Sequence, residues 1–400
     1  MKITFLGDLT ADRRMLAAAK KEDGSFDFGR SLQFVPDTLK SSDAVVGNLE
    51  TVFGGARLGY NPWPIAYNSP DELLEAFRAM GVSVMTTANN HSLDQGKKGL
   101  LRTLDLIEEA GMTHTGTFRT TAEPRFLVQR IGGIRIGLVA YADAVNRTAA
   151  GTQQADDAMA LVNHFRPYGK RSFKENLIAG LSTFLPIKEA RANKSKKRSA
   201  AGIKTVKPRV DDKPLTPDDM AELVQVIDCL DEARKACDYL VACIHTGGQF
   251  NGEPGLHSQS IYELLKPHAD AIMGNHAHVA QRIETYGGEG VLAYALGGFN
   301  MSVGAEYVTA DDHPEFSIGV HLYVEKDAED RVRLEKATFT LYYIEEDETG
   351  DLTVYPVNAE GGKGDNEAMR TVFRRIAGYD FPGFMEEYPV AGLTGSDRSR

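Results

Sequence analysis

Cysteine, long apolar runs and a leader-like start are all scarce or missing in this chain of 400 residues. It has three cysteines, Cys229, Cys237 and Cys243, and they form no CxxC pair. Because their number is odd, a disulfide framework is not expected, and we interpret them as reduced core residues. No apolar run reaches the roughly 18 residues of a transmembrane helix, and the N-terminal residues lack the apolar segment of a signal peptide. We therefore predict no transmembrane segment and a cytoplasmic location.

An excess of positive charge is also missing, because the formal net charge is −11. Nucleic-acid backbones attract basic surfaces, so we expect no nucleic-acid partner. The overall charge does not exclude a locally basic pocket. The length alone predicts two domains, or one large domain with insertions.

Short apolar strands alternate with amphipathic helices along most of the chain. Strands are predicted at Lys2 to Leu6 and at Asp238 to His245, and a helix between them over Ser69 to Gly81. This alternation predicts an α/β fold with βαβ units and a mostly parallel inner sheet. After Pro314 the pattern changes to β-type runs separated by turn residues. Residues 311–400 are therefore expected to form an antiparallel strand extension, a short helix and a tail.

A stretch of weak periodicity, about residues 149–213, interrupts this alternation and is expected to be an insertion. Its second half, up to Arg209, is strongly basic. Two interpretations stay open for the basic run. It is either a solvated surface lobe or a lid over an anionic substrate.

Polar side chains follow five of the predicted strands, at the point where each strand ends. Ligands of α/β sheets bind at the carboxyl ends of the strands, so these side chains are expected to meet at one edge. Each alone has an ordinary explanation, such as a helix cap or a core histidine. Together their carboxylates, carboxamides and imidazoles predict one or two divalent ions, namely manganese, zinc or iron. The set is Asp8, Asn48, Glu50, Asn90, His91, His245, His276 and His278.

The order of these polar segments resembles the bacterial capsule-synthesis protein A family. The segments are FLGD, GNLET, ANNHSLDQG, IHTGG and GNHAHV, followed by YALGGF, and they extend over about residues 1–302. That family is associated with poly-γ-glutamate and has a metallophosphoesterase-like fold. The resemblance therefore implies, over about residues 1–310, a calcineurin-like layered sandwich with central mixed sheets flanked by helices.

Carried over residue by residue, the resemblance implies separate roles at a metal centre. Asp8 and His278 would bind a first ion, whereas Asn90, His245 and His276 would bind a second. One carboxylate of the family pattern bridges the two ions.

The remaining roles fall on the neighbouring residues. Glu50, or Asn48 beside it, would stand at the bridging place. His91 would face the substrate as a catalytic residue, and Asp94 would orient it. The chain departs from the pattern at Thr10, where metallophosphoesterases usually carry a further histidine.

These inferences lead to two hypotheses of different classes. The first is a metal-dependent hydrolase of a phosphate ester or a related small anionic or polyanionic substrate. The second is a non-catalytic polyanion-binding protein that assists poly-γ-glutamate synthesis or transport, with a membrane-associated synthase as partner. The residues predicted to contact substrate are Asn48, Arg57, Arg119, Gln249, which stands where relatives carry glutamate, and Glu253.

Overall fold

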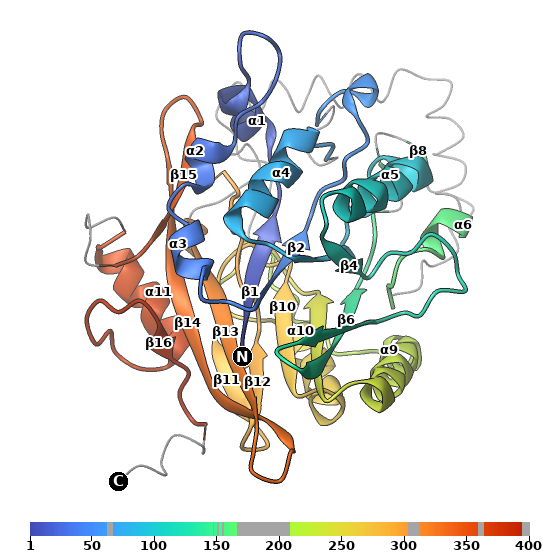
Figure 1. Cartoon of the computed structure of the whole chain (residues 1–400), viewed down its shortest axis with the longest axis vertical. Coiled ribbons are helices and arrows are strands. Elements are labelled where there is room, and N and C mark those ends of the chain that lie inside the picture. Colours follow the sequence, from blue (N-terminus) through green and yellow to red (C-terminus); the bar gives the residue numbers. More distant parts are fainter. Residues whose placement is uncertain are drawn as a thin grey trace.

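The computed structural model describes residues 1–61, 67–146, 148–149, 152–153, 156–165, 209–302, 312–358 and 364–393. Two mixed β-sheets form its centre, and helices flank them (Figure 1). This arrangement confirms the predicted α/β class with central mixed sheets flanked by helices. Most of the expected basic insertion, residues 166–208, lies outside the described residues.

The first sheet joins strands from both ends of the chain. Its strands β1, β2, β3 and β4 are parallel, and β13 pairs with β1 in the antiparallel direction. The division into two domains near residue 310 stays a prediction. In spatial order the sheet contains β15 (Leu352–Pro356), β14 (Val332–Glu346), β13 (Phe316–Lys326), β1 (Lys2–Leu9), β2 (Ala44–Leu49), β3 (Val84–Thr86) and β4 (Thr113–Thr115), with β16 (Tyr388–Pro389) beside β14.

The second sheet is parallel at its centre and antiparallel at both edges. Its parallel strands are β6, β9, β10 and β12, so their carboxyl ends lie at the same edge. In spatial order it contains β11 (Ile283–Tyr286), β12 (Gly290–Ala293), β10 (Ala271–Asn275), β9 (Tyr239–His245), β6 (Ile134–Ala142) and β5 (Leu127–Ile131). A separate hairpin pairs β7 (Thr148–Ala149) with β8 (Thr152–Gln153).

Three clusters of buried apolar side chains hold these layers together. One lies between the sheets and includes Phe5 of β1 and Val241 of β9. A second joins the other face of the first sheet to α1 (Arg13–Ala19), α2 (Gly29–Leu32), α3 (Pro36–Leu39) and α4 (Asp71–Met80). A third joins the second sheet to α9 (Pro217–Ala236) and α10 (Leu256–Leu265). The other helical segments are η1 (Ala56–Leu58), α5 (Gly96–Glu109), α6 (Asp156–Met159), η2 (Lys266–His268) and α11 (Glu367–Ala377).

Helix boundaries follow the local signals that the sequence carries. Thr216 caps α9 through a reciprocal capping box with Asp219, and Pro217 occupies the first turn. Gly81 ends α4 in the left-handed conformation, with φ of 111°. None of the described helices combines the length and the apolarity that crossing a membrane requires.

The two sheets approach each other closely beside Asp8. The register between β1 and β2 shifts between Leu6 and Asp8, and the N–H of Asp8 donates to the carbonyl of Gly297, 2.9 Å away. A Cβ atom on Gly7 would collide with that same carbonyl oxygen. Glycine at position 7 therefore allows the strand to place Asp8 between the sheets.

Gly7→Ala should lower the free energy of unfolding by about 1–3 kcal/mol, because the added methyl group overpacks this junction. Urea unfolding monitored by circular dichroism would measure the change. Gly29→Ala is the matched control, since a Cβ there meets only the exposed Asp27 side chain at 3.2 Å. Equal stabilities for the two variants would contradict the proposed tight contact.

Candidate metal centre

The carboxyl ends of parallel strands bring the predicted polar side chains together. One group comes from the first sheet, and the other comes from β9 and the turn after β10. Hydrogen bonds and short ion-pair distances connect the two groups across the sheets. The convergence expected from the sequence is thus present for Asp8, Asn48, Glu50, Asn90, His91, His245, His276 and His278.

Asp8 is fully buried and is held by groups from both sheets. Asn48 donates from Nδ2 to its Oδ1 at 2.6 Å, and the backbone N–H of His276 donates to its Oδ2 at 3.2 Å. Thr86 donates to the carboxamide oxygen of Asn48 at 3.2 Å. Asn48 therefore turns its nitrogen, not its oxygen, toward the cluster, and this orientation suits a partner of Asp8 better than a metal ligand.

Glu50 is the group that a cation would satisfy. Its side chain has no exposed surface, and neither of its oxygens has a hydrogen-bond partner among the described residues. Imidazole nitrogens of His245 and His278 lie 3.5 and 3.6 Å away. Glu50, His276 and His278 each offer one ligand atom, and these atoms lie within 4.8 Å of one another. Buried carboxylates are normally paired, so this donor set fits a divalent cation.

The pKa shifts within the cluster also favour the binding of a cation. Burial, with smaller contributions from Asp8 and Asp94, raises the pKa of Glu50 well above its usual value. Burial, with smaller contributions from His276 and other nearby imidazoles, lowers the pKa of His245 well below its usual value. His245 is therefore held as the neutral imidazole, which is the form that binds metals.

The histidine pair after β10 lies on strained backbone. His276 and His278 have φ angles of 93° and 57°, in the left-handed region that side chains other than glycine rarely adopt. Nδ1 of His276 lies 3.0 Å from Nε2 of His245, and Nδ1 of His278 lies 3.1 Å from Oδ2 of Asp8. Strain of this kind persists where the surroundings impose it, often at functional sites.

Asn90 and His91 reach the cluster from the loop after β3. Oδ1 of Asn90 lies 2.8 Å from Nε2 of His245. The preceding Asn89 is fully buried and holds the loop, since it donates to the carbonyl of Leu49 and accepts from the N–H of His91. This bracing explains why Asn90, and not Asn89, presents its side chain to the cluster.

The imidazole of His91 lies against the carboxylate of Asp94. Its Nδ1 lies 2.6 Å from Oδ2 of Asp94, which also accepts the N–H of Tyr67 at 2.7 Å. The Tyr67 ring packs against the imidazole, with centroids 4.4 Å apart. Nε2 of His91 then faces Glu50, whose Oε1 lies 3.8 Å away.

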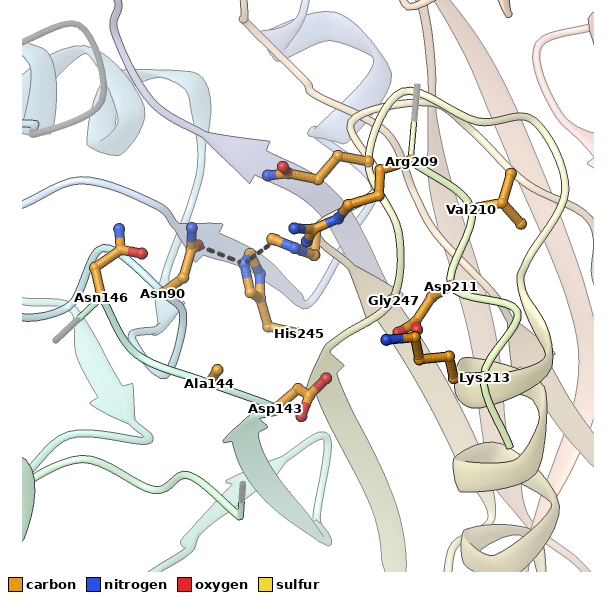
Figure 2. A pocket seen from close by; sticks show the side chains of 12 residues that line it. Asn90, Asp143, Ala144, Asn146, Arg209, Val210, Asp211, Lys213, His245 and Gly247 are labelled. Carbon is orange, nitrogen blue, oxygen red and sulfur yellow. Dashed lines mark hydrogen bonds between the residues drawn. The ribbon is translucent and has the colours of Figure 1, made fainter. Parts of the chain in front are cut away.

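A cavity of about 470 Å³ opens beside the cluster (Figure 2). Asn90, His245 and His276 form part of its wall. The other wall residues include Asp143, Asn146, Arg209, Asp211, Lys213 and Gln249. A ligand in this cavity would therefore meet the candidate metal centre and groups of both charges.

Asp143 is a cavity residue that the sequence analysis missed. It follows β6 directly, so the rule applied to the other strand ends would have found it. Asp143, Asp211 and His257 form a second group whose ligand atoms lie within 4.8 Å of one another. No local pattern could have found Asp211, because it reaches the cavity only through tertiary contacts.

Three of the predicted substrate contacts lie elsewhere. Arg57 is exposed on η1. Arg119 pairs with Asp105 and Glu108 of α5 at 2.5 and 2.7 Å, and Glu253 pairs with Arg282 at 3.1 Å. None of the three is among the residues lining the cavity, whereas Gln249 is.

Glu50→Gln should stabilise the metal-free protein at neutral and higher pH. The pKa of Glu50 is higher in the folded state than in the unfolded state, so its contribution to stability is fully present at a pH below the unfolded-state pKa. That contribution is lost as the pH rises through the folded-state pKa. Removing the charge should therefore raise the free energy of unfolding by roughly 1 kcal/mol or more near pH 8, with little effect near pH 4. Urea unfolding in the presence of a chelator, at each of the two pH values, measures these changes in the free energy of unfolding. Glu75→Gln, at a half-exposed carboxylate, is the control, and a less stable Glu50→Gln protein near pH 8 would contradict the prediction.

Comparison with known proteins identifies a family, two relatives and one solved structure. The family described as bacterial capsule synthesis protein PGA_cap matches residues 2–302. The capsule biosynthesis protein CapA of Bacillus anthracis is 21% identical over 309 residues, covering 76% of this chain and 60% of that protein. The PGA biosynthesis protein CapA of Bacillus subtilis (strain 168) is 20% identical over 308 residues, covering 76% of this chain and 64% of that protein.

The chain thus spans less than two thirds of the length of these two relatives. A crystal structure of a hypothetical protein from Thermus thermophilus aligns with 89% of this chain and 98% of its own. The TM-score is 0.38 at 13% identity.

Proposed function

We propose, for a chain that belongs to the bacterial capsule synthesis family PGA_cap, the metal-dependent hydrolysis of a phosphate ester or a related anionic substrate. The observation that carries the proposal is the buried Glu50 carboxylate, which has imidazoles around it and no hydrogen-bond partner among the described residues. A metallophosphoesterase-like arrangement of the sheets is part of the same proposal.

The ligand atoms for the cation come from both sheets. Asp8 and Glu50 supply carboxylates, and His245, His276 and His278 supply imidazoles, with the carboxamide oxygen of Asn90 beside them. These residues would hold a divalent ion, or a pair of ions, which would supply the Lewis acidity that polarises an oxyanion and acidifies water. Asn48 fixes one oxygen of Asp8 by a hydrogen bond and so orients that ligand.

His91 is the residue that handles a proton in the proposed reaction. Its Nδ1–H donates to Asp94, which fixes the tautomer and leaves Nε2 toward the cluster. In the protonated imidazole, Nε2 can donate its proton to the leaving oxygen of the substrate. Asp94 stays in place because it also accepts the N–H of Tyr67.

The names of the relatives favour a role in making a capsule polymer. One is called a capsule biosynthesis protein and the other a PGA biosynthesis protein. We propose that the substrate of this chain is an anionic intermediate or polymer end of such a process. A cytoplasmic location and a membrane-associated synthase as partner stay predictions.

His276→Ala should lower metal content and hydrolysis together, because it removes an imidazole from the cluster. Loss of one ligand is expected to weaken metal binding by about 10- to 100-fold or more. Metal analysis of protein purified without chelators measures the first effect. Hydrolysis of bis(4-nitrophenyl) phosphate with added manganese measures the second. His268→Ala is the control, since His268 pairs with Asp231 on the surface.

Full metal content in His276→Ala would contradict the assignment of that ligand. A wild-type protein that binds metal but hydrolyses no phosphate ester or γ-glutamyl amide would favour the alternative role, a non-catalytic polyanion-binding protein.

His91→Ala should retain metal but lose turnover by roughly 10²- to 10⁴-fold, the usual contribution of a positioned acid or base. Asp94→Asn should lower turnover by a smaller factor, because this change misorients the imidazole of His91 without removing it. Parallel measurements of metal content and the rate constant kcat separate this role from a structural one. Unchanged turnover in His91→Ala would show that another group handles the proton.

A further inference from the structure

A short segment, Arg209 to Lys213, passes over the loop that follows β9. We call this segment the strap. Arg209 and Gln249 exchange two backbone hydrogen bonds of 2.8 and 2.9 Å, and the N–H of His257 donates to the carbonyl of Asp211 at 2.9 Å. The strap is therefore attached at two separate points, one on this loop and one on the first turn of α10.

Two glycines allow the strap to lie so close to this loop. A Cβ atom on Gly248 would collide with the carbonyl of Arg209, and one on Gly255 would collide with the backbone of Asp211. Only glycine, without a Cβ, allows such a close backbone approach at both points. The contact therefore fixes where the side chains of the strap enter the cavity.

The strap places a guanidinium group in the cavity wall. Arg209 lines the cavity together with His245 and His276, and its side chain extends from the strap across the pocket toward His245 (Figure 2). Within the ranges that the structure describes, no carboxylate forms an ion pair with Arg209. The guanidinium groups of Arg119 and Arg282, by contrast, pair with carboxylates.

The charges around the cavity restrict where an anion can lie. Asp143 and Asp211 also line it and would repel a second anionic group, whereas Arg209 and Lys213 supply its positive charge. Arginine binds phosphate and carboxylate through two parallel hydrogen bonds, which fixes orientation as well as position.

We propose that Arg209 is the residue that binds the oxyanion of the ligand, and that the strap positions it through Gly248. This inference rests on the proposed function, because it assigns the ligand of the same cavity. It specifies a ligand whose phosphate or carboxylate group bridges the space between Arg209 and the His245–His276 wall.

Titration of the full chain with inorganic phosphate tests the proposal without any turnover. Isothermal calorimetry, with and without manganese, should show phosphate binding roughly 10- to 100-fold weaker in Arg209→Ala than in wild type. Arg209→Lys should recover only part of the loss, because it keeps the charge and loses the paired hydrogen bonds. Arg30→Ala removes the same charge from an exposed side chain and should bind like wild type.

A second variant tests the strap itself. Gly248→Ala should weaken phosphate binding to a similar degree while metal content and circular dichroism stay unchanged. The double variant Gly248→Ala/Arg209→Ala should be no weaker than Arg209→Ala alone, because both changes remove one interaction. Additive losses would show that Gly248 acts by another route and would overturn the positioning role.

Phosphate binding by Arg209→Ala equal to that of wild type would overturn the proposal, as would a wild type that binds no phosphate with or without manganese. A wild type that takes up no metal, or hydrolyses nothing, would count against the proposed function alone. The phosphate titration of metal-free protein would still decide the role of Arg209.

Discussion

The candidate metal centre is built around a carboxylate that has no hydrogen-bond donor among the described residues. Glu50 is completely buried, and imidazoles surround it at distances longer than good hydrogen bonds. An ionised carboxylate in that place costs free energy until a cation compensates it. The raised pKa of Glu50 and the lowered pKa of His245 are two effects of the same burial. The surrounding fold maintains a buried carboxylate that is unfavourable without a compensating charge, as is common where function requires it.

The parallel strands of two sheets explain how such a site can be built. Parallel strands end at the same edge, so each contributes a side chain without a long loop. The two sheets meet closely at Gly7, which lets Asp8 contact groups from both. The left-handed turns at His276 and His278 then direct two imidazoles back toward the carboxylates. Tight packing holds this geometry because the side chains that support it, such as Asn89 and Thr86, are themselves buried and bonded.

Part of the cavity wall comes from a different segment of the chain than the candidate metal centre. Strand ends supply the cluster, but the strap that carries Arg209 and Asp211 enters from a segment outside the strand–helix alternation. A site that combines a rigid cluster with a separately attached wall can keep one chemistry while its ligand preference changes. The family match covers residues 2–302 and so includes both the cluster and the strap.

The sequence by itself determined the elements and the donor types. Apolar periodicity and capping residues such as Thr216 and Gly81 are local signals, and the helices begin and end near them. The position of polar residues after strands predicted that Asp8, Glu50 and the histidines would meet, because parallel strands share an edge. Tertiary structure alone decided how the side chains point: Asn48 turns its nitrogen to Asp8, and Arg119 pairs with α5 instead of lining the cavity. Those outcomes depend on distances between residues far apart in the chain, which neither spacing nor composition contains.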